Sequence, residues 1–304
     1  MGINATAGKF EKMLEEEVRK VKGNASPVRT PFLRRLLTKY LRCDQIHPNP
    51  DDEFCVPSVG PSYEIISGYV QTISYGRKQG EHKFFEQPVL VEKITPDGYM
   101  LLNGHHRWAA AIKAGLPEIR VKIVNLTQQN DLSKMLARAK NTKRVVLDLD
   151  EVVYRKEFGE MTEKPLPFPF GRLYRDPMRL GIPALFNSLG DRGYDIWVYT
   201  ARYDSFESVL QYFHLHHTRV CGVVTGMKRK TGAFAVFREQ MEKMMSARYE
   251  QTLHIDNNSV VWINNRTKEY RDYAIECPEI EWVGRVTDTV RAIEKENRPS
   301  GKEE

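Results

Sequence analysis

An apolar run that ends in two carboxylates constrains the fold of this chain most. Residues 145–150 read Val-Val-Leu-Asp-Leu-Asp, which is typical of a strand buried on both faces of a parallel sheet. Ligands of such sheets bind beyond the carboxyl ends of the strands, where Asp148 and Asp150 would emerge. Two neighbouring carboxylates repel each other, so the pattern favours a hard cation such as Mg²⁺, and with it phosphate chemistry. The simpler alternative is a strand whose acidic end meets solvent.

Three further segments follow this pair in a fixed order. Residues 194–202 predict a second apolar strand, which ends in Thr200 and Arg202, and residues 251–258 predict a third, which ends in the carboxylate of Asp256. Between them, a lysine-rich turn at 228–230 precedes a helix-like stretch through Met245. The order of acid pair, threonine, lysine and acid resembles the haloacid dehalogenase (HAD) superfamily of phosphotransferases over residues 143–292.

The resemblance implies a role for each of these positions. Asp148 would attack the phosphoryl group and carry it as an aspartyl-phosphate, while Asp150 would act as general acid and base. Thr200 would donate a hydrogen bond to the phosphoryl oxygens. Lys230 would neutralise their charge, with Lys228 as the alternative.

The resemblance also predicts the metal site and shows departures from the family. Asp256 would bind Mg²⁺ together with Asp148 and the main-chain carbonyl of Asp150. The family often has a Gly-Thr pair where Glu151-Val152 stands, and a second acid where Asn257-Asn258 stands; an amide there could bind a metal-bound water. Arg202 is similar in position to the arginine of polynucleotide phosphatases in this superfamily, and we treat it as a candidate phosphate ligand. An ordinary exposed arginine would give the same pattern.

A second candidate site lies upstream, in residues 97–115. Here Asp97-Gly98 predicts a turn, Tyr99–Leu102 a short strand, and Asn103 the N-cap of a helix that Gly115 ends. The turn and first helical residues are Gly104, His105, His106 and Arg107. Free amides and three potential cations at a helix start predict a phosphate or nucleotide site, although a surface helix with a polar first turn would look the same.

The segment Asn103-Gly-His-His-Arg107 resembles the phosphate-binding signature of the ParB/sulfiredoxin fold, over residues 44–127, and Ile46–Pro50 is similar to the opening motif of that fold. His105 stands where sulfiredoxin needs a cysteine, which argues against sulfiredoxin activity. The closest type is the free-serine kinase, in which an acid follows the opening motif. This implies Glu53 as a base acting on a substrate hydroxyl, with ATP or ADP as cofactor, although Asn103 replaces the acid that the kinase has before the glycine.

Length and composition bound the remaining choices. The 304 residues, 41% hydrophobic and 28% charged, suit two globular domains, and we expect neither a membrane span nor a signal peptide, which makes the cytoplasm the default location. The four cysteines show no paired spacing, so neither a zinc site nor a disulfide framework is indicated. Of the net charge of +6, much lies in residues 29–42, which predict an amphipathic helix with a basic face and a potential nucleic-acid contact.

The sequence thus predicts two α/β units. The first is a small ParB/sulfiredoxin-like α+β domain (44–127), and the second is a Rossmann-like HAD domain with a small cap insertion (143–292). A helical basic extension (1–43) precedes them, a linker (128–142) joins them, and a polar tail (293–304) follows. The leading hypothesis is a magnesium-dependent phosphatase with an upstream nucleotide-binding domain that could be a second phosphotransferase. Basic groups around both sites would favour anionic substrates, either phosphorylated small molecules or nucleotides. The alternative is a nucleotide-gated, nucleic-acid-binding or end-processing protein of ParB-like type.

Overall fold

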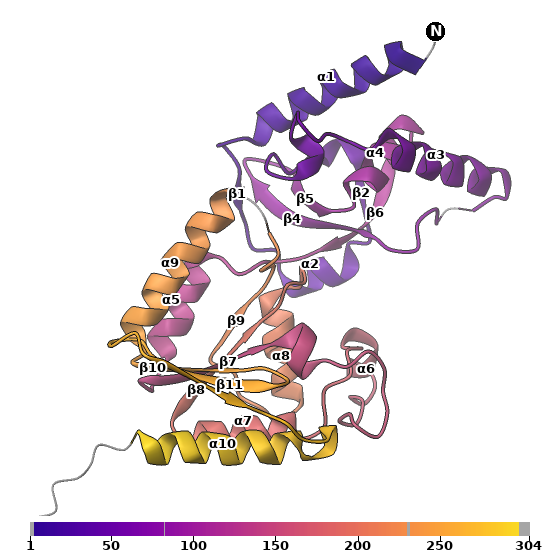
Figure 1. Ribbon diagram of the computed structural model, residues 1–304. Helices are drawn as coiled ribbons and strands as arrows, with labels where there is room; N and C mark the ends of the chain where they lie inside the picture. The colour runs from indigo at the N-terminus through magenta and orange to yellow at the C-terminus, as the bar shows by residue number, and fades with distance from the viewer. Residues whose placement is uncertain (1–2, 82, 230–231, 298–304) are drawn as a thin grey trace, which may run out of the picture. The chain divides into compact units, whose positions relative to one another are not determined.

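The chain is a mixed α/β protein that divides into two compact units. The first contains the residues up to Leu126 together with 232–234, and the second contains the other described residues from Thr127 onward. The computed structural model describes residues 3–81, 83–229 and 232–297, so Lys230, the expected phosphate-neutralising lysine, and the end of the polar tail lie outside the described residues. Each unit has its own mixed sheet (Figure 1). Each also has its own hydrophobic core. None of the described helices has the length and apolar character needed to cross a bilayer.

The first unit is built on a sheet in the order β2-β6-β4-β5-β3, with β1 paired to β4. Parallel pairing joins β4 to β6 and β3 to β5, and the other pairs are antiparallel. Helix α4 packs on this sheet through its fully buried Trp108 and three buried alanines that follow it. The elements are α1 (Ile3–Val21), β1 (Ser26–Pro27), α2 (Phe32–Leu37), β2 (Tyr40–Arg42), β3 (Ile46–Pro48), α3 (Tyr63–Lys78), β4 (Val89–Thr95), β5 (Tyr99–Asn103), α4 (His105–Lys113) and β6 (Glu118–Ile123).

The predicted amphipathic helix over residues 29–42 is wrong. Only α2, Phe32–Leu37, is helical, and Thr38 already has extended backbone angles. Residues 40–42 form β2 instead, which pairs antiparallel with β6 at Glu118–Arg120. A short edge strand is stabilised by a partner that lies far away in the sequence, and local amphipathic spacing carries no trace of that partner.

The second unit has the strand order β12-β11-β10-β7-β8-β9, in which β10, β7, β8 and β9 are parallel. The chain passes from β7 through β8 to β9 on one side and returns to β10 on the other side of β7. The order therefore reverses between β7 and β10. The elements are α5 (Gln129–Arg138), β7 (Lys143–Asp148), a π-helical turn (Leu149–Val153), α6 (Phe170–Leu173), α7 (Ile182–Asp191), β8 (Tyr194–Tyr199), α8 (Phe206–Leu215), β9 (Gly222–Val224), α9 (Gly232–Arg248), β10 (Gln251–Ile255), β11 (Ser259–Asn264), β12 (Tyr270–Ala274) and α10 (Trp282–Glu296).

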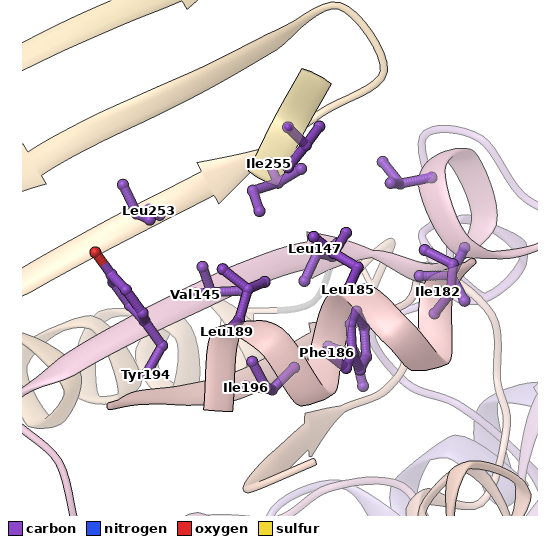
Figure 2. Close-up of a cluster of buried hydrophobic side chains, with 14 of the residues drawn as sticks. Val145, Leu147, Ile182, Leu185, Phe186, Leu189, Tyr194, Ile196, Leu253 and Ile255 are labelled. Carbon is purple, nitrogen blue, oxygen red and sulfur yellow. The ribbon is translucent and has the colours of Figure 1, made fainter. Parts of the chain in front are cut away.

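Strand β7 is buried on both faces, as its continuous apolar run predicts. Val145 and Leu147 point toward α7, where Leu185 and Leu189 meet them (Figure 2). Val146, on the opposite face, belongs to a separate cluster formed with residues of α5 and α9. The helices α7, α8 and α10 thus cover one face of the sheet, and α5 and α9 cover the other.

The segment between β7 and α7, expected to be a small cap, contains little regular structure. Two isolated bridges, Tyr154 with Met178 and Thr162 with Arg179, connect its two arms, and α6 is its one α-helix among the described residues. The residues from Pro177 to Leu189 predict a helix in the sequence, but α7 starts later, at Ile182, because Gly181 adopts a left-handed conformation (φ 82°) and ends the preceding extended segment.

Candidate functional sites

In the second unit, three of the predicted side chains lie at one edge of the sheet. The register pairs Leu147 with Ile255 and Asp148 with Tyr199, so Asp148 ends β7 beside Asp256 after β10 and Thr200 after β8. This edge is the carboxyl end of the parallel strands, at the point where the strand order reverses. In open α/β sheets ligands bind at that position.

The turn after β7 fixes the orientation of Asp148. Its Oδ1 accepts hydrogen bonds from the backbone amides of Asp150 at 2.7 Å and Glu151 at 3.0 Å, so the carboxylate caps the π-helical turn. Burial raises the pKa of Asp148 and outweighs the two amides, which lower it. A half-buried, oriented carboxylate at a ligand-binding edge is suited to nucleophilic attack or to cation binding.

Asp150 is joined to the end of β8. Its Oδ2 accepts hydrogen bonds from Thr200 Oγ1 and from the amide of Ala201, both at 2.9 Å. Its Oδ1 is buried and makes no hydrogen bond with the described part of the chain, and Arg202 Nε lies 4.0 Å from it. The Thr200 hydroxyl, 1% exposed, thus donates its proton to Asp150 and would have to rotate before it could donate to a phosphoryl group.

Arg202, the candidate phosphate ligand, binds carboxylates in this structure. Asp176 accepts from its two terminal nitrogens at 2.7 and 3.2 Å, and Asp204 lies 3.0 Å from its Nε. These partners raise the pKa of Arg202 despite its partial burial. To contact a phosphate, Arg202 would have to exchange Asp176 for it.

The residues at this edge fit Mg²⁺ in kind. Asp148 and Asp256 are oxygen donors on neighbouring strand ends, and Mg²⁺ typically takes one or two carboxylates plus water and substrate oxygens. In the described residues no three His, Cys, Asp or Glu side chains gather as a metal cluster, so a larger all-protein cage is absent there. Asp256 and Lys228 are both exposed.

A cavity of about 500 Å³ borders Asp150. Its wall contains five carboxylates and two cations, Arg155 and Lys156, and Arg155 is already paired with Glu279 at 2.6 Å. The expectation that basic groups surround this site is therefore wrong for the cavity. The sequence shows which cations stand at strand ends and helix starts, but it does not show which residues the insertion between β7 and α7 brings to the cavity wall. The lining residues are Asp150, Glu151, Tyr154, Arg155, Lys156, Glu157, Gly159, Glu160, Met161, Thr162 and Glu279.

In the first unit, the N-cap of α4 is Gly104 and not Asn103, which ends β5. Gly104 has φ 95°, in the left-handed region that favours glycine. A Cβ there would lie 2.8 Å from Val89 Cγ1 and 2.9 Å from Arg107 Nη2. The turn thus requires glycine for its backbone angle and for its close contacts.

His105 is buried against the segment that follows β3. It is 6% exposed, its ring centroid lies 5.4 Å from that of Phe54, and its Nδ1 is 3.6 Å from Asp52 Oδ1. Burial lowers the pKa of His105 to about 4, so the ring is neutral near pH 7 and adds no positive charge to the turn. Its Nε2 is buried without a hydrogen-bond partner in the described structure.

The other two candidates of this turn hold neighbouring loops. His106 Nε2 accepts from the amide of Ser62 at 3.2 Å, and Arg107 donates to the carbonyls of Gln87 and Pro88 and to Asn103 Oδ1. Of the three potential cations expected here, the ring of His105 is neutral and buried, the ring of His106 accepts an amide proton, and Arg107 binds the loop before β4.

Among the acids after β3, Asp52 lies against His105 of the turn, and the sequence did not single it out. Asp52 Oδ1 accepts from the amide of Phe54 at 3.0 Å and so caps the short 3₁₀ helix Glu53–Cys55, next to His105. The Asp-x-Phe spacing, in which an aspartate precedes a short turn and a buried aromatic residue, was the available signal. Glu53, the predicted base, is exposed.

Comparisons with known proteins bear on the first unit. Residues 39–139 match the family model of the ParB N-terminal domain. This third of the chain is ParB-like. The match begins next to β2 and ends just after α5, before the strand that carries Asp148, so the HAD-like interpretation of the second unit depends on that unit's own residues. No curated protein matches the sequence.

Solved structures with some likeness include two of the chromosome-partitioning protein ParB from Caulobacter crescentus, one complexed with CTP-γ-S and one with the centromeric parS site. They are 22% and 21% identical, cover 34% and 33% of this chain, and have TM-scores of 0.23 and 0.22. The chain spans about half of their length, 55% and 46%. A free serine kinase in complex with AMP is 14% identical over 80% of this chain and 92% of its own, with a TM-score of 0.22. At these TM-scores the likenesses support no argument about function.

Proposed function

We propose that the second unit is a magnesium-dependent phosphatase of HAD type, with a Rossmann-like sheet, that acts through an aspartyl-phosphate on Asp148. The observation that supports this most directly is the register of three parallel strands, which gathers Asp148, Thr200 and Asp256 at the edge where the strand order reverses. The domain limits that we propose for this unit are those of the resemblance, residues 143–292.

In this mechanism an Asp148 oxygen forms a bond to phosphorus while the bond from phosphorus to the leaving oxygen breaks, and Asp150 protonates that oxygen. Asp150 then takes a proton from water, which attacks phosphorus, releases phosphate and restores Asp148. Its buried Oδ1, which has no hydrogen-bond partner in the described structure, is the atom available to hold this proton. Mg²⁺ held by Asp148, Asp256 and the Asp150 carbonyl would supply positive charge for the phosphoryl oxygens. Lys228 or Lys230 would add to it, with Thr200 and Arg202 as phosphate ligands.

The test is phosphate release with Mg²⁺ on a panel of phosphorylated metabolites, nucleotides and oligonucleotides. Asp148→Asn should reduce turnover by at least about a thousandfold, because an amide is a poor nucleophile. Asp191→Asn, which changes an exposed aspartate at the end of α7, is the control and should keep full activity. Equal turnover in Asp148→Asn and wild type would exclude this active site.

For the first unit we propose nucleotide binding at the turn between β5 and α4, supported by the ParB-like match over residues 39–139 and by the left-handed Gly104 before the helix start. The ligands would be the backbone amides of residues 104–107, with ATP or ADP as the first nucleotides to test. A kinase-like second activity, with Glu53 as base, is the finer form of this proposal. Titration with labelled ATP, ADP and CTP tests it, with Gly104→Ala as the variant that should lose binding.

A second candidate function, nucleotide-gated nucleic-acid binding or end processing, is favoured by the same family match. Arg34 and Lys39 are exposed beside Phe32 and Tyr40, so the α2–β2 segment (residues 32–42) presents cations and aromatic rings together. Binding to a labelled oligonucleotide that strengthens when nucleotide is added would support this function.

A further inference from the structure

The amide of Asn257 connects the two strand ends that carry the candidate metal ligands. Its Nδ2 donates to the carbonyl of Glu151, in the turn after β7, at 3.0 Å. Its Oδ1 accepts from Arg179 Nη1 at 3.0 Å, and its own carbonyl accepts from Trp282 Nε1 at 2.8 Å. Both ends of the Asn257 side-chain amide are thus engaged by the protein, which leaves Asn258 as the other amide of the pair that could bind a metal-bound water.

Arg179 is held firmly enough to fix Asn257. It is 4% exposed, its guanidinium lies 3.8 Å from the ring centroid of Trp282, and its backbone amide donates to the carbonyl of Val153 at 2.8 Å. Burial and the neighbouring Arg155 lower the pKa of Arg179 to about 10, so it still carries a charge near pH 7. A buried, charged donor between an aromatic ring and an amide has little freedom to move.

The residues that Asn257 links also hold the two carboxylates. The amide of Glu151 donates to Asp148 Oδ1 at 3.0 Å, and the amide of Asn257 itself donates to Asp256 Oδ1 at 2.6 Å. A change in the bond from Asn257 to Glu151 would therefore move Asp148 and Asp256 relative to each other. A small hard cation that demands near-ideal geometry is sensitive to such a movement.

We infer that Asn257, fixed by Arg179, is a positioning residue that sets the separation of Asp148 and Asp256 for a hard divalent cation. This inference rests on the function proposed for the second unit, since it concerns the same site. It assigns Asn257 a role different from that of the second acid that stands at this position in the family, because the amide acts through hydrogen bonds to both strand ends.

The test is titration of Mn²⁺, a hard cation that favours the same oxygen ligands, followed by the EPR signal of the free ion. Asn257→Ala should raise the Kd for Mn²⁺ about tenfold to a hundredfold, the range seen when partners of metal ligands are removed. Arg179→Lys keeps the charge but should lose the bond to Asn257 and raise the Kd as well. In the double variant the two effects should be less than additive, because both act through one contact.

Asn265→Ala is the matched control. Asn265 Nδ2 donates to the Tyr249 carbonyl and to Thr252 Oγ1, both at 2.9 Å, so its loss also removes two hydrogen bonds, but at the opposite end of β10. This variant should lower the Tm and leave the Kd unchanged. Wild type that does not bind Mn²⁺, or Asn257→Ala and Arg179→Lys variants with the wild-type Kd, would overturn the inference. If wild type binds Mn²⁺ but releases no phosphate, and the two variants bind Mn²⁺ more weakly than wild type, the positioning role of Asn257 stands and the phosphatase function is rejected.

Discussion

Gly104 shows how one residue determines the shape of the candidate nucleotide site. Its φ of 95° would cost an alanine about 1–2 kcal/mol, and the Cβ contact with Val89 at 2.8 Å adds to this. We expect Gly104→Ala to destabilise the first unit by about 2 kcal/mol or more. Gly115→Ala is the control, because Gly115 has φ 66° but nothing within 4 Å of a Cβ, and it should cost about 1 kcal/mol. Urea unfolding measures both, and equal losses would show that the contacts at Gly104 are relieved without cost.

A second prediction at this scale concerns His105 and pH. Its pKa of about 4 in the folded state lies below the ordinary 6.5. Below pH 6.5 the unfolded chain therefore binds a proton at His105, and the folded chain does not bind it until the pH falls to about 4. The corresponding stability is present above pH 6.5 and is lost as the pH falls to about 4. His105→Phe removes this titration, so its Tm should depend less on pH over that window than the Tm of wild type. Parallel curves for the two proteins would contradict the assignment.

The candidate site could be predicted in part from single residues. Asp148 and Asp256 were identifiable because Asp148 ends one strand and Asp256 directly follows another, and strand ends converge at one edge of a parallel sheet. Asn257 and Asp52 were missed in these roles, since their contacts are made by residues such as Arg179 and His105, far away in the sequence. The hydrogen bond from the Thr200 hydroxyl to Asp150 is likewise a consequence of tertiary packing.

At the scale of elements, β7 and β8 were predictable because each contains a run of three or more consecutive apolar residues, which suits a strand that is buried on both faces. Strand β2 was not, because three residues at a sheet edge are ordered by pairing with β6. The helix α7 was predicted with its start too early, since Gly181 sets the boundary through its backbone angle.

The packing of β9 against β8 leads to a prediction at this scale. A Cβ on Gly222 would lie 2.2 Å from the ring of Trp197, which is fully buried. Gly222→Ala should therefore destabilise the second unit by about 3 kcal/mol. Gly190→Ala, on the exposed side of α7 with nothing within 4 Å of the new Cβ, should instead stabilise it by about 0.5–1 kcal/mol. Thermal unfolding compares them, and a neutral Gly222→Ala would show that Trp197 can shift.

At the scale of the whole molecule, a net charge of +6 attracts any polyanion, so binding to nucleic acid at low salt says little by itself. The informative quantity is the slope of log affinity against log salt, which counts the phosphates that are neutralised. If the α2–β2 segment contacts nucleic acid, replacing both Arg34 and Lys39 with glutamine should reduce that slope by about 1–2.

A charge-matched control separates local contact from net charge. Arg238→Gln with Lys243→Gln on α9 removes the same two charges, from cations that already pair with Glu242 and Glu239 at 3.4 and 2.6 Å. We expect this double variant to keep the wild-type slope, while phosphate release with Mg²⁺ stays unchanged in both. An equal reduction of the slope in the two double variants would mean that nucleic-acid binding depends on the overall charge. The exposed cations of the α2–β2 segment would then have no specific role in nucleic-acid binding.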